Sequence, residues 1–156
     1  MILAADIGNT RTTFALFTET GQLSFLSELD TDRRMTDDQC AIRILGVFQL
    51  YRADIAQVKG AILSSVVPPV TGIYARAIQR LTGNAPLIVG PGLKTGLNIR
   101  ADVHNQLGSD IVASAVAAMA LYPTPVIVIN SHTADSFSYI SHSAFEGCAT
   151  MPGMGI

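Results

Sequence analysis

The chain has 156 residues, of which 49% are hydrophobic and only 14% are charged, and its mean hydropathy is +0.38. Such an apolar composition excludes intrinsic disorder and predicts a chain with a substantial buried core. The net charge of −2 and the lack of a basic run exclude the electrostatic footprint of a nucleic-acid-binding protein.

Sequence features that direct a chain to a membrane or to an oxidising compartment are missing. The longest stretch of apolar and small residues, Ile111–Leu121, is shorter than the roughly 20 residues that a membrane-spanning helix needs. Met1 leads directly into a predicted strand without a charged leader. Cys40 and Cys148 lack metal-ligand spacing, which favours two buried thiols in a reducing compartment. We therefore expect a cytoplasmic protein that binds neither membrane nor nucleic acid.

Short apolar runs separated by turns predict three strands at the start of the chain, over residues 2–7, 12–18 and 23–29. Two such short turns indicate an antiparallel meander. The capping box Thr36–Gln39 then opens a helix that should continue to about Tyr51. The next predicted elements are a buried strand, a helix after a Pro-Pro pair and a short strand, over residues 60–66, 70–82 and 86–89. This order of elements indicates a mixed sheet with helices packed against it.

The second part of the sequence begins with a glycine-rich loop and an alanine-rich helix, residues 108–122. An apolar strand over 126–129, a polar turn and another strand over 134–141 follow. This strand–turn–strand junction repeats the one at the start of the chain, which indicates a duplicated fold. We therefore expect a first domain over residues 1–122, closed by the alanine-rich helix, and the opening strands of a second domain over residues 123–156.

The turn between the first two strands carries the residues with the clearest chemistry. Asp6 stands near the end of the first strand, and Gly8, Asn9 and Thr10 follow it. Glycine lets a backbone approach a ligand closely, and the two residues after it can donate hydrogen bonds to an anion. A carboxylate beside a phosphate is favourable where a hydrated divalent cation lies between the two negative groups. An ordinary hairpin turn, in which Asn and Gly are common, is the alternative.

Several motifs, in this order, resemble those of the type III pantothenate kinases, a family within the actin-like and sugar-kinase superfamily. The matching segments are Asp6–Thr10, Thr31–Arg34, Ser64–Pro68, Gly90–Arg100, Gly108–Asp110 and Pro152–Gly153. The resemblance covers essentially the whole chain, and family members continue beyond it. It implies the α/β, ribonuclease H-like fold of the actin-like ATPases: a mixed sheet with flanking helices, followed by the first strands of a second similar domain.

The resemblance also implies a function, the ATP-dependent phosphorylation of pantothenate to 4'-phosphopantothenate, which is the first step of coenzyme A biosynthesis. The cofactors that it implies are ATP, magnesium and a monovalent cation, either potassium or ammonium. The partners that it implies are the small-molecule substrate pantothenate and a second copy of the chain in a homodimer.

By position in the matching motifs, the resemblance assigns roles to individual residues. The nucleotide-binding residues would be Asp6, Ile7, Gly8, Asn9, Thr10, Arg11, Thr12, Thr13 and Thr133. The pantothenate-binding residues would be Ala101, Gly108, Ser109, Asp110 and Ile111, and the metal-binding positions would be Asp6 and Asn130. Asp110 matches the catalytic proton acceptor, and the start of a helix favours a negative charge there. The alternative is that Asp110 only caps this helix.

Some positions depart from the family pattern. Ile111 replaces an arginine after the catalytic aspartate, and Ala101 replaces a tyrosine. An arginine clamps an anion at two points, which an aliphatic side chain cannot do. In the second phosphate motif, Asn130 replaces an aspartate and His132 replaces a glycine. Asp135 adds a negative charge to the second phosphate motif. Its carboxylate either replaces the lost cation ligand or repels the phosphate.

Two functional hypotheses follow from these departures. The first is an enzyme, active as written or with a missing portion supplied. The second is a non-catalytic binding or regulatory protein that dimerises with a complete homologue. A fragment of a longer protein is a further reading that the sequence leaves open. Arg33 and Arg34, within one of the matching segments, are interpreted as a solvated turn pair, with a role as phosphate ligands as the alternative.

Overall fold

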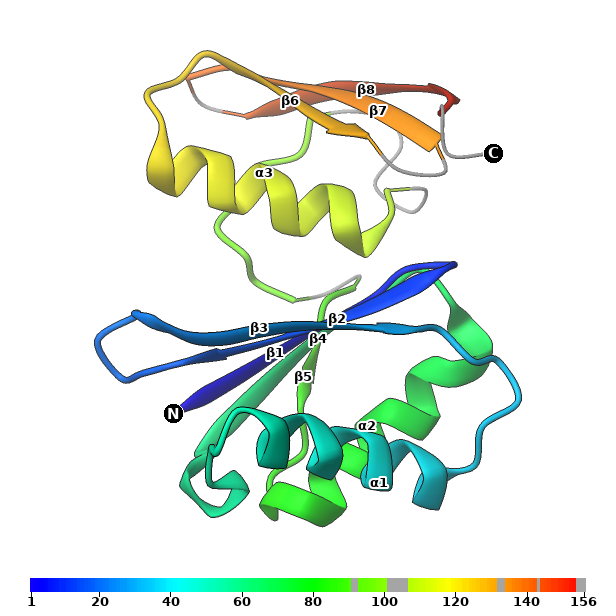
Figure 1. Ribbon diagram of the computed structural model, residues 1–156. Coiled ribbons are helices and arrows are strands. Elements are labelled where there is room, and N and C mark those ends of the chain that lie inside the picture. Colours follow the sequence, from blue (N-terminus) through cyan, green and yellow to red (C-terminus); the bar gives the residue numbers. More distant parts are fainter. Residues whose placement is uncertain (91–92, 101–106, 132–133, 143, 154–156) are drawn as a thin grey trace. The chain divides into compact units, whose positions relative to one another are not determined.

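The computed structural model describes residues 1–90, 93–100, 107–131, 134–142 and 144–153. Its contacts divide the chain into two compact units, Met1–Val89 and Gly90–Ile156 (Figure 1). Among the described residues, the helices are too short or too polar to cross a bilayer.

The first unit is built on a five-stranded mixed sheet. Its strands are β1 (Ile2–Ile7), β2 (Arg11–Phe17), β3 (Leu23–Asp30), β4 (Gly60–Ser65) and β5 (Leu87–Ile88). They lie in the order β3–β2–β1–β4–β5. The β1–β2 and β2–β3 pairs are antiparallel, whereas β4 is parallel to both β1 and β5. The mixed sheet that the element order predicts is confirmed.

Two helices lie on one side of this sheet (Figure 1). α1 (Asp37–Leu50) begins at the predicted capping box, in which the Thr36 hydroxyl accepts from the Gln39 amide and the Gln39 side chain accepts from the Thr36 amide. α2 (Pro68–Thr82) begins at the Pro-Pro pair and ends at Gly83. The φ of 75° at Gly83 is the left-handed conformation that glycine adopts readily at a helix end. A short 3₁₀ helix, η1 (Ile55–Gln57), precedes β4.

The core of the first unit lies between the sheet and these two helices. Alternate residues of the central strands point into it and are almost completely buried: Leu3, Ala5 and Ile7 on β1, Phe14 and Leu16 on β2, and Ala61 and Leu63 on β4. Because side chains alternate across a strand, Asp6 of β1 points to the opposite face, away from α1 and α2.

The second unit contains α3 (Ser109–Leu121) and an antiparallel sheet of β6 (Val126–Ser131), β7 (Ala134–Ile140) and β8 (Phe145–Pro152), in that order. The sequence does not predict β8, because this segment lacks apolar alternation and contains a glycine; pairing with β7 makes it a strand. α3 packs on one face of this sheet, with Ala115 and Ala118 in one cluster with Ile140 and Phe145.

α3 also changes the expected division of the chain. The sequence favours a boundary after residue 122, because the alanine-rich helix precedes the repeated junction. The contacts instead divide the chain between Val89 and Gly90, so α3 belongs with the second sheet. The physical reason is the packing of its small side chains against β6 and β7, which sequence order does not reveal.

The β1–β3 and β6–β8 meanders repeat one another residue by residue. Their strands have six, seven and eight residues in each case. The second pairing of each meander shifts register at the same point, between Leu16 and Phe17 and between Tyr139 and Ile140. Asp6 pairs with Thr13 as Asn130 pairs with Ser136, so Asp6 and Asn130 occupy equivalent positions. The β6–β8 meander therefore repeats the strands that open the first unit.

The two cysteines differ in exposure. Cys40 of α1 is fully buried, and burial raises the pKa of its thiol to about 12. Cys148 is a free thiol on β8 and is only partly buried. The expectation of two buried thiols is therefore confirmed for Cys40 and wrong for Cys148, because burial falls along β8 from Phe145 to Pro152.

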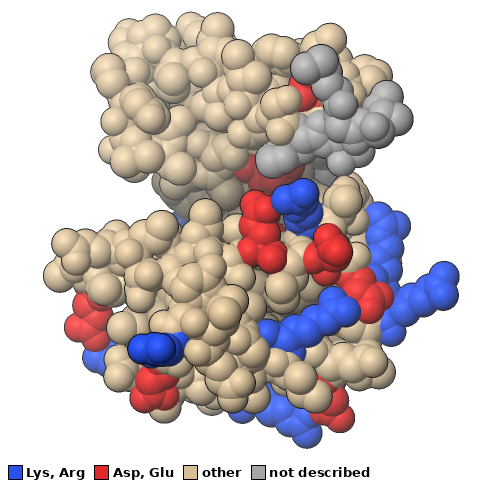
Figure 2. Space-filling view, in the orientation of Figure 1, with Lys and Arg blue, Asp and Glu red and all other residues tan. Residues whose placement is uncertain are grey.

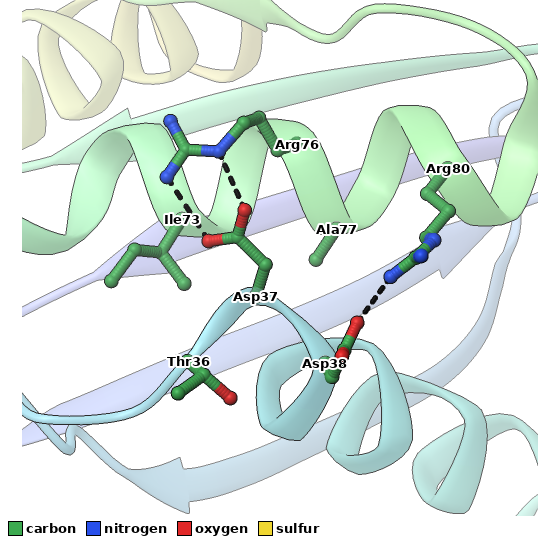
Figure 3. Close-up of a pocket in the computed structure, with 7 residues that line it drawn as sticks. All are labelled: Thr36, Asp37, Asp38, Ile73, Arg76, Ala77 and Arg80. Atoms are coloured by element: carbon green, nitrogen blue, oxygen red, sulfur yellow. Dashed lines mark hydrogen bonds and ion pairs between the residues drawn. The ribbon is translucent and has the colours of Figure 1, made fainter.

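A shallow groove lies between α1 and α2 (Figure 3). Its charges are paired: Arg76 Nε and Nη2 donate to the two carboxylate oxygens of Asp37 at 2.7 and 3.0 Å, and Arg80 pairs with Asp38. The hydrogen bond from Arg76 lowers the pKa of the Asp37 carboxyl. Both acidic residues lie in the first turn of α1, where negative charge is favourable. We interpret the groove as a contact that joins the two helices.

Replacing Arg76 by Met should lower stability in a pH-dependent way. The pKa of the Asp37 carboxyl is lower in the folded chain than the value of about 3.9 expected in the unfolded chain. The ion pair of Asp37 with Arg76 therefore adds to the free energy of unfolding above that pH, and this added stability is lost as the pH falls below it. Urea unfolding should therefore show a difference between R76M and the parent at pH 7 that shrinks below about pH 4. R34M, which removes an exposed arginine whose guanidinium has no partner among the described residues, is the control. If the difference in stability between R76M and the parent does not change with pH, the arginine acts through packing of its side chain and not through the ion pair with Asp37.

Candidate active site

The β1–β2 turn is a tight hairpin in which the Gly8 amide donates to the Arg11 carbonyl at 2.9 Å. A Cβ atom at residue 8 would lie 2.9 Å from that carbonyl oxygen, so only glycine fits without opening the turn. Asn9 and Thr10 form the exposed tip. Within the described residues, the amide groups of Asn9 and Thr10 donate to no protein acceptor. Free amide groups on successive turn residues form an arrangement suited to an anion.

Asp6 lies two residues before this turn, and its side chain is exposed. Its neighbours on the two adjacent strands are Thr13 of β2 and Ser64 of β4. All three side chains lie on the sheet face opposite to α1 and α2, because they share a register position. The turn therefore combines one accessible carboxylate with a neighbouring hydroxyl on each side and with two free amides.

Residues Thr31–Arg34, which connect β3 to α1, hold the turn; we call them the strap. The Thr31 amide donates to the Thr10 carbonyl at 2.9 Å, and the Thr31 hydroxyl donates to the Gly8 carbonyl at 2.8 Å. Arg33 Nη2 donates to the side-chain oxygen of Asn9 at 2.9 Å. The strap thus donates hydrogen bonds to the carbonyl groups of Gly8 and Thr10 and leaves the amides of Asn9 and Thr10 available to a ligand.

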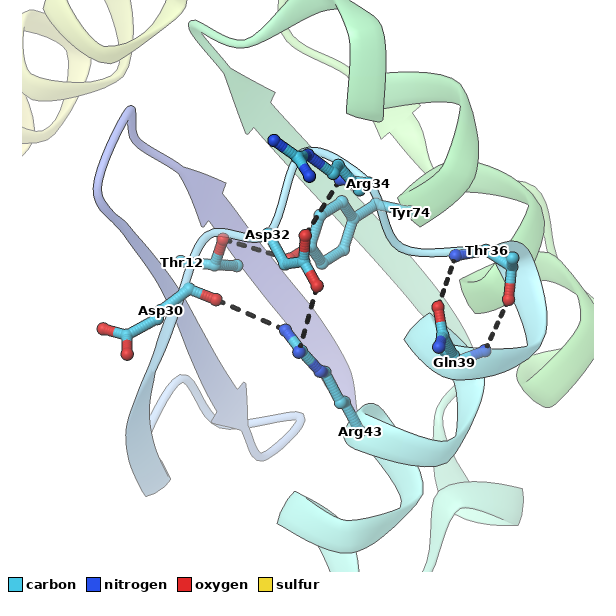
Figure 4. Close-up of polar contacts among 8 residues, drawn as sticks. All are labelled: Thr12, Asp30, Asp32, Arg34, Thr36, Gln39, Arg43 and Tyr74. Atoms are coloured by element: carbon cyan, nitrogen blue, oxygen red, sulfur yellow. Dashed lines mark hydrogen bonds and ion pairs between the residues drawn. The ribbon is translucent and has the colours of Figure 1, made fainter.

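Behind the strap, a chain of hydroxyl groups runs from α2 to the turn. Thr12 Oγ1 lies 2.9 Å from Thr31 Oγ1. It also lies 3.1 Å from the Tyr74 hydroxyl (Figure 4). Thr31 has already donated its only hydroxyl proton to Gly8, so it accepts from Thr12, which in turn accepts from Tyr74. Burial raises the pKa of Tyr74, so its phenol stays protonated and able to donate at neutral pH. Chains of this kind strengthen each of their hydrogen bonds.

Arg43 of α1 fixes the strap from the other side. Its guanidinium donates to an Asp32 carboxylate oxygen at 3.3 Å and to the Asp30 carbonyl at 3.5 Å (Figure 4). The other carboxylate oxygen of Asp32 accepts from the Arg34 amide at 2.9 Å. The turn is therefore linked to α1 through Arg43 and to α2 through Tyr74.

The predicted nucleotide-binding residues of the first unit fall into two groups. Those at least partly exposed beside the turn are Asp6, Gly8, Asn9, Thr10, Arg11 and Thr13. Ile7 and Thr12 are completely buried. The Ile7 side chain belongs to the core and its carbonyl accepts from Val66, while the Thr12 hydroxyl is used in the chain above. Ile7 and Thr12 therefore support the turn from behind. Arg11 pairs with Glu28 across the sheet at 2.8 Å.

Sequence reasoning missed two supports of the turn. Arg33 is exposed in a turn, as interpreted from the sequence, but the interpretation missed the hydrogen bond that its guanidinium donates to Asn9. The match of Thr31–Arg34 to a family motif was the available signal for this contact. Tyr74 had no such signal, since it occupies an ordinary buried position of an amphipathic helix.

At the start of α3, Gly108 is the N-cap and makes no side-chain cap, and Ser109 is buried. Asp110 lies in the first turn and is partly exposed. Among the described residues, its carboxylate takes part in no hydrogen bond or ion pair. The alternative that Asp110 caps the helix is therefore wrong, because Gly108 occupies the cap position.

Two of the departures from the family pattern have structural partners. Ile111 packs with Leu97, Ile99 and Leu107 against the core of the second unit, where an arginine would place a charge. Asn130 Nδ2 donates to Ser114 Oγ of α3 at 3.2 Å. The amide of Asn130 therefore binds the helix, and only its carbonyl oxygen remains as a neutral ligand.

Asp135 does not compensate for Asn130. It pairs with Ser131 and accepts the Ser131 hydroxyl at 2.7 Å. Asn130 and Ser136 form the next pair, so side-chain alternation directs Asp135 and Asn130 to opposite faces of the sheet. The alternative that Asp135 takes over the lost cation ligand is therefore wrong. Ala101, His132 and Thr133 lie outside the described residues.

The residues at the turn fit a magnesium ion that arrives with a nucleotide. Among the described residues, no three His, Cys, Asp or Glu side chains gather into a metal site. Magnesium bound with phosphates usually takes one or two protein carboxylates and completes its coordination with water and phosphate oxygens. The single exposed carboxylate of Asp6, beside free amides that can bind the phosphates, meets this requirement.

A family model described as type III pantothenate kinase matches residues 2–156. The chain belongs to this family. Curated relatives named Type III pantothenate kinase include those of Listeria welshimeri, 40% identical, and Brevibacillus brevis, 38% identical, each over 157 residues. The alignments cover 100% of this chain but 60% and 61% of the two relatives. The type III pantothenate kinase chain described here therefore spans about three-fifths of the length of these relatives.

Solved structures share the fold at low sequence identity. An acetate kinase from Porphyromonas gingivalis has a TM-score of 0.53 at 13% identity, covering 99% of this chain and 57% of that one. Ethanolamine utilization protein EutJ from Carboxydothermus hydrogenoformans has a TM-score of 0.52 at 12% identity, covering 98% and 52%. These likenesses confirm the predicted α/β fold of the actin-like ATPases and sugar kinases.

Replacing Thr31 by Val should destabilise the first unit by about 1–3 kcal/mol, because the Gly8 carbonyl loses its donor and Thr12 loses its acceptor. Urea unfolding monitored by circular dichroism measures the change. T20V is the control, since it removes a hydroxyl whose partner, Thr18, lies in an exposed turn. Equal effects of T31V and T20V would show that the strap does not hold the turn.

Proposed function

We propose that this chain supplies the nucleotide-binding turn and the substrate-positioning aspartate of a kinase that transfers phosphate from ATP to pantothenate, giving 4'-phosphopantothenate. The observation that carries the proposal is the β1–β2 turn, with an exposed Asp6, two free amides and a strap that leaves those amides available. Family membership supports pantothenate as the acceptor. Because the chain spans 60% of its relatives, the activity of the whole protein is itself part of the proposal.

In this proposal, the amides of Asn9 and Thr10 bind the phosphate tail of ATP. Asp6 holds the accompanying magnesium, whose chemistry is to neutralise charge on the phosphates. The strap keeps the carbonyl groups of Gly8 and Thr10 turned away, so the phosphates meet donors and not acceptors. Preorganised donors of this kind avoid the cost of reorienting the backbone when the nucleotide binds.

Asp110 would hold the pantothenate hydroxyl in line for phosphoryl transfer and accept its proton late. Its position in the first turn of α3 favours the negative charge, and within the described residues its carboxylate has no protein partner to displace. Phosphoryl transfer needs positioning and charge stabilisation more than a strong base. Gly108 and Ser109 place Asp110 at the start of the helix.

The second phosphate motif favours a second candidate function, a non-catalytic binding or regulatory protein that dimerises with a complete homologue. Asn130 has no charge and binds Ser114, and Asp135 lies on the other face of the sheet. Ile111 is committed to the apolar core. A chain with these features retains the first half of a nucleotide site and loses charges from the second.

The family resemblance supports three further proposals. The kinase uses a monovalent cation, either potassium or ammonium; it works as a homodimer; and it is located in the cytoplasm.

Calorimetric titration with ATP and magnesium, and then with pantothenate, tests the proposal directly. The parent chain should bind ATP more tightly with magnesium than without it. D6N should weaken the magnesium-supported binding at least about tenfold, a loss of roughly 1.4 kcal/mol or more, and should barely change binding without the metal. D54N, which removes an exposed carboxylate from the cap of η1 while keeping a capping side chain, is the matched control.

The same samples distinguish the two candidate functions. Phosphorylation of pantothenate by the purified chain would reject the non-catalytic candidate. Binding of ATP without any turnover would favour it. An absence of ATP binding even at millimolar nucleotide would overturn the nucleotide-binding role of the turn.

Restoring the family residues of the altered motifs should raise nucleotide affinity. The triple variant I111R/N130D/H132G returns an arginine clamp, a carboxylate and a small turn residue. The double variant N130D/H132G avoids the charge that I111R places against Leu97 and Ile99, and the Ser114 hydroxyl can donate to the new carboxylate. Titration with ATP and magnesium measures both variants. If neither binds more tightly than the parent, the altered positions do not face the nucleotide.

A further inference from the structure

Tyr74 of α2 is the remote end of the hydroxyl chain that reaches the β1–β2 turn. Its hydroxyl lies 3.1 Å from Thr12 Oγ1, although the two residues are 62 positions apart in the sequence. Tyr74 is 3% exposed and Thr12 is 0% exposed, so the contact is shielded from water. The Tyr74 ring packs against Phe14, with the ring centroids 6.1 Å apart, which fixes the phenol relative to the sheet. The chain of hydroxyl groups therefore begins at a rigid, buried donor.

The other end of the chain sets the direction of an amide group. Thr31 Oγ1 donates to the Gly8 carbonyl at 2.8 Å. The Gly8 carbonyl and the Asn9 amide belong to one planar peptide unit, and a trans peptide directs its oxygen and its amide proton to opposite sides. Because the carbonyl is held toward Thr31, the Asn9 amide points away from the strap. The hydroxyl chain thus fixes the first of the two amides that bind phosphate in the proposed function.

Tyr74 also determines the direction in which the chain donates. The Thr31 proton has two acceptors within reach, the Gly8 carbonyl and Thr12 Oγ1. A phenol is more acidic than a threonine hydroxyl, so Tyr74 is the donor in its bond to Thr12. Thr12 then donates its own proton to Thr31, which leaves the Gly8 carbonyl as the acceptor for the Thr31 proton. Without the Tyr74 hydroxyl, Thr31 could donate to Thr12 instead and release the carbonyl.

The direction of the amides matters because the charge on the surface of the first unit is mixed. On the face of this unit seen in Figure 2, acidic and basic side chains lie side by side. Their effects on an anion largely cancel each other, whereas an amide that points at the anion binds it directly. Anion binding at the turn therefore depends on how well its amides are held in place.

We propose that Tyr74 is a positioning residue of the nucleotide site. Through Thr12 and Thr31 it holds the Asn9 amide in the direction that binds phosphate, although Tyr74 itself touches no ligand. This role rests on the proposed function of the turn as a nucleotide site. It gives α2, whose other buried side chains belong to the core, a direct effect on the ligand-binding tip of the turn.

Replacing Tyr74 by Phe removes the hydroxyl and keeps the ring. Calorimetric titration with ATP and magnesium should show that Y74F binds about three- to tenfold more weakly than the parent, the range expected for the net loss of one hydrogen bond. In the ligand-free chain, the nuclear magnetic resonance signal of the Asn9 amide should shift. Y51F is the matched control, because the Tyr51 hydroxyl also donates one hydrogen bond, at 2.8 Å to the Leu26 carbonyl on β3. Y51F should leave ATP affinity and the Asn9 signal unchanged.

A double-mutant cycle tests the route through the strap. In the T31V background, Y74F should cause no further loss of ATP affinity, since the chain of hydroxyl groups is already broken. T12V breaks the same chain and replaces T31V in the cycle if T31V does not fold. The proposal is overturned if Y74F binds ATP as tightly as the parent, if the Asn9 signal does not move, or if Y74F causes the same loss in both backgrounds.

The Asn9 signal separates this proposal from the proposed function. If the parent chain binds no ATP, the nucleotide-binding role of the turn fails. A shift of the Asn9 signal in Y74F but not in Y51F would then still show that Tyr74 controls the direction of this amide. An unchanged signal would overturn that control as well.

Discussion

The hydrogen bond from the Thr31 hydroxyl to the Gly8 carbonyl is the contact on which the candidate site depends. It turns an acceptor away from the tip of the β1–β2 turn, where the amides of Asn9 and Thr10 remain free. Through Thr12 it is coupled to Tyr74 of α2, and through the strap it is coupled to α1. The packing of two helices on one face of a sheet therefore determines the shape of a turn whose carboxylate lies on the other face.

The repeated meander shows how two halves of one architecture can diverge. The first half keeps Asp6 exposed and surrounds it with hydroxyl groups. The second half has Asn130 at the same position, bound to Ser114 of α3. The amide of Asn130 donates to Ser114, and its carbonyl oxygen is a neutral ligand, so the substitution removes a charged cation ligand and keeps a contact with α3.

The repeat also explains an imbalance between the two units. In each unit helices cover one face of the sheet, but α1 and α2 bury the face that carries Leu3 and Phe14, whereas α3 lies on the opposite face of the repeated meander and leaves the equivalent Ile127 and Phe137 exposed. A three-stranded meander can bury one face against a single helix, but its other face then exposes large apolar side chains to water.

The sequence by itself determined the family and most of the helices and strands, but not β8 or η1. Apolar periodicity, the Thr36–Gln39 capping box and the Pro-Pro pair predict the strands and helices of the first unit, because these signals act between residues close in the chain. Only the tertiary structure decided which residues support the turn and which side chains share a face. The bond of Arg33 to Asn9, the buried hydroxyl of Tyr74, the packing of α3 on the second sheet and the separation of Asp135 from Asn130 all depend on strand register and on contacts between distant segments. Local sequence patterns carry no record of such contacts, since they arise only when the elements pack.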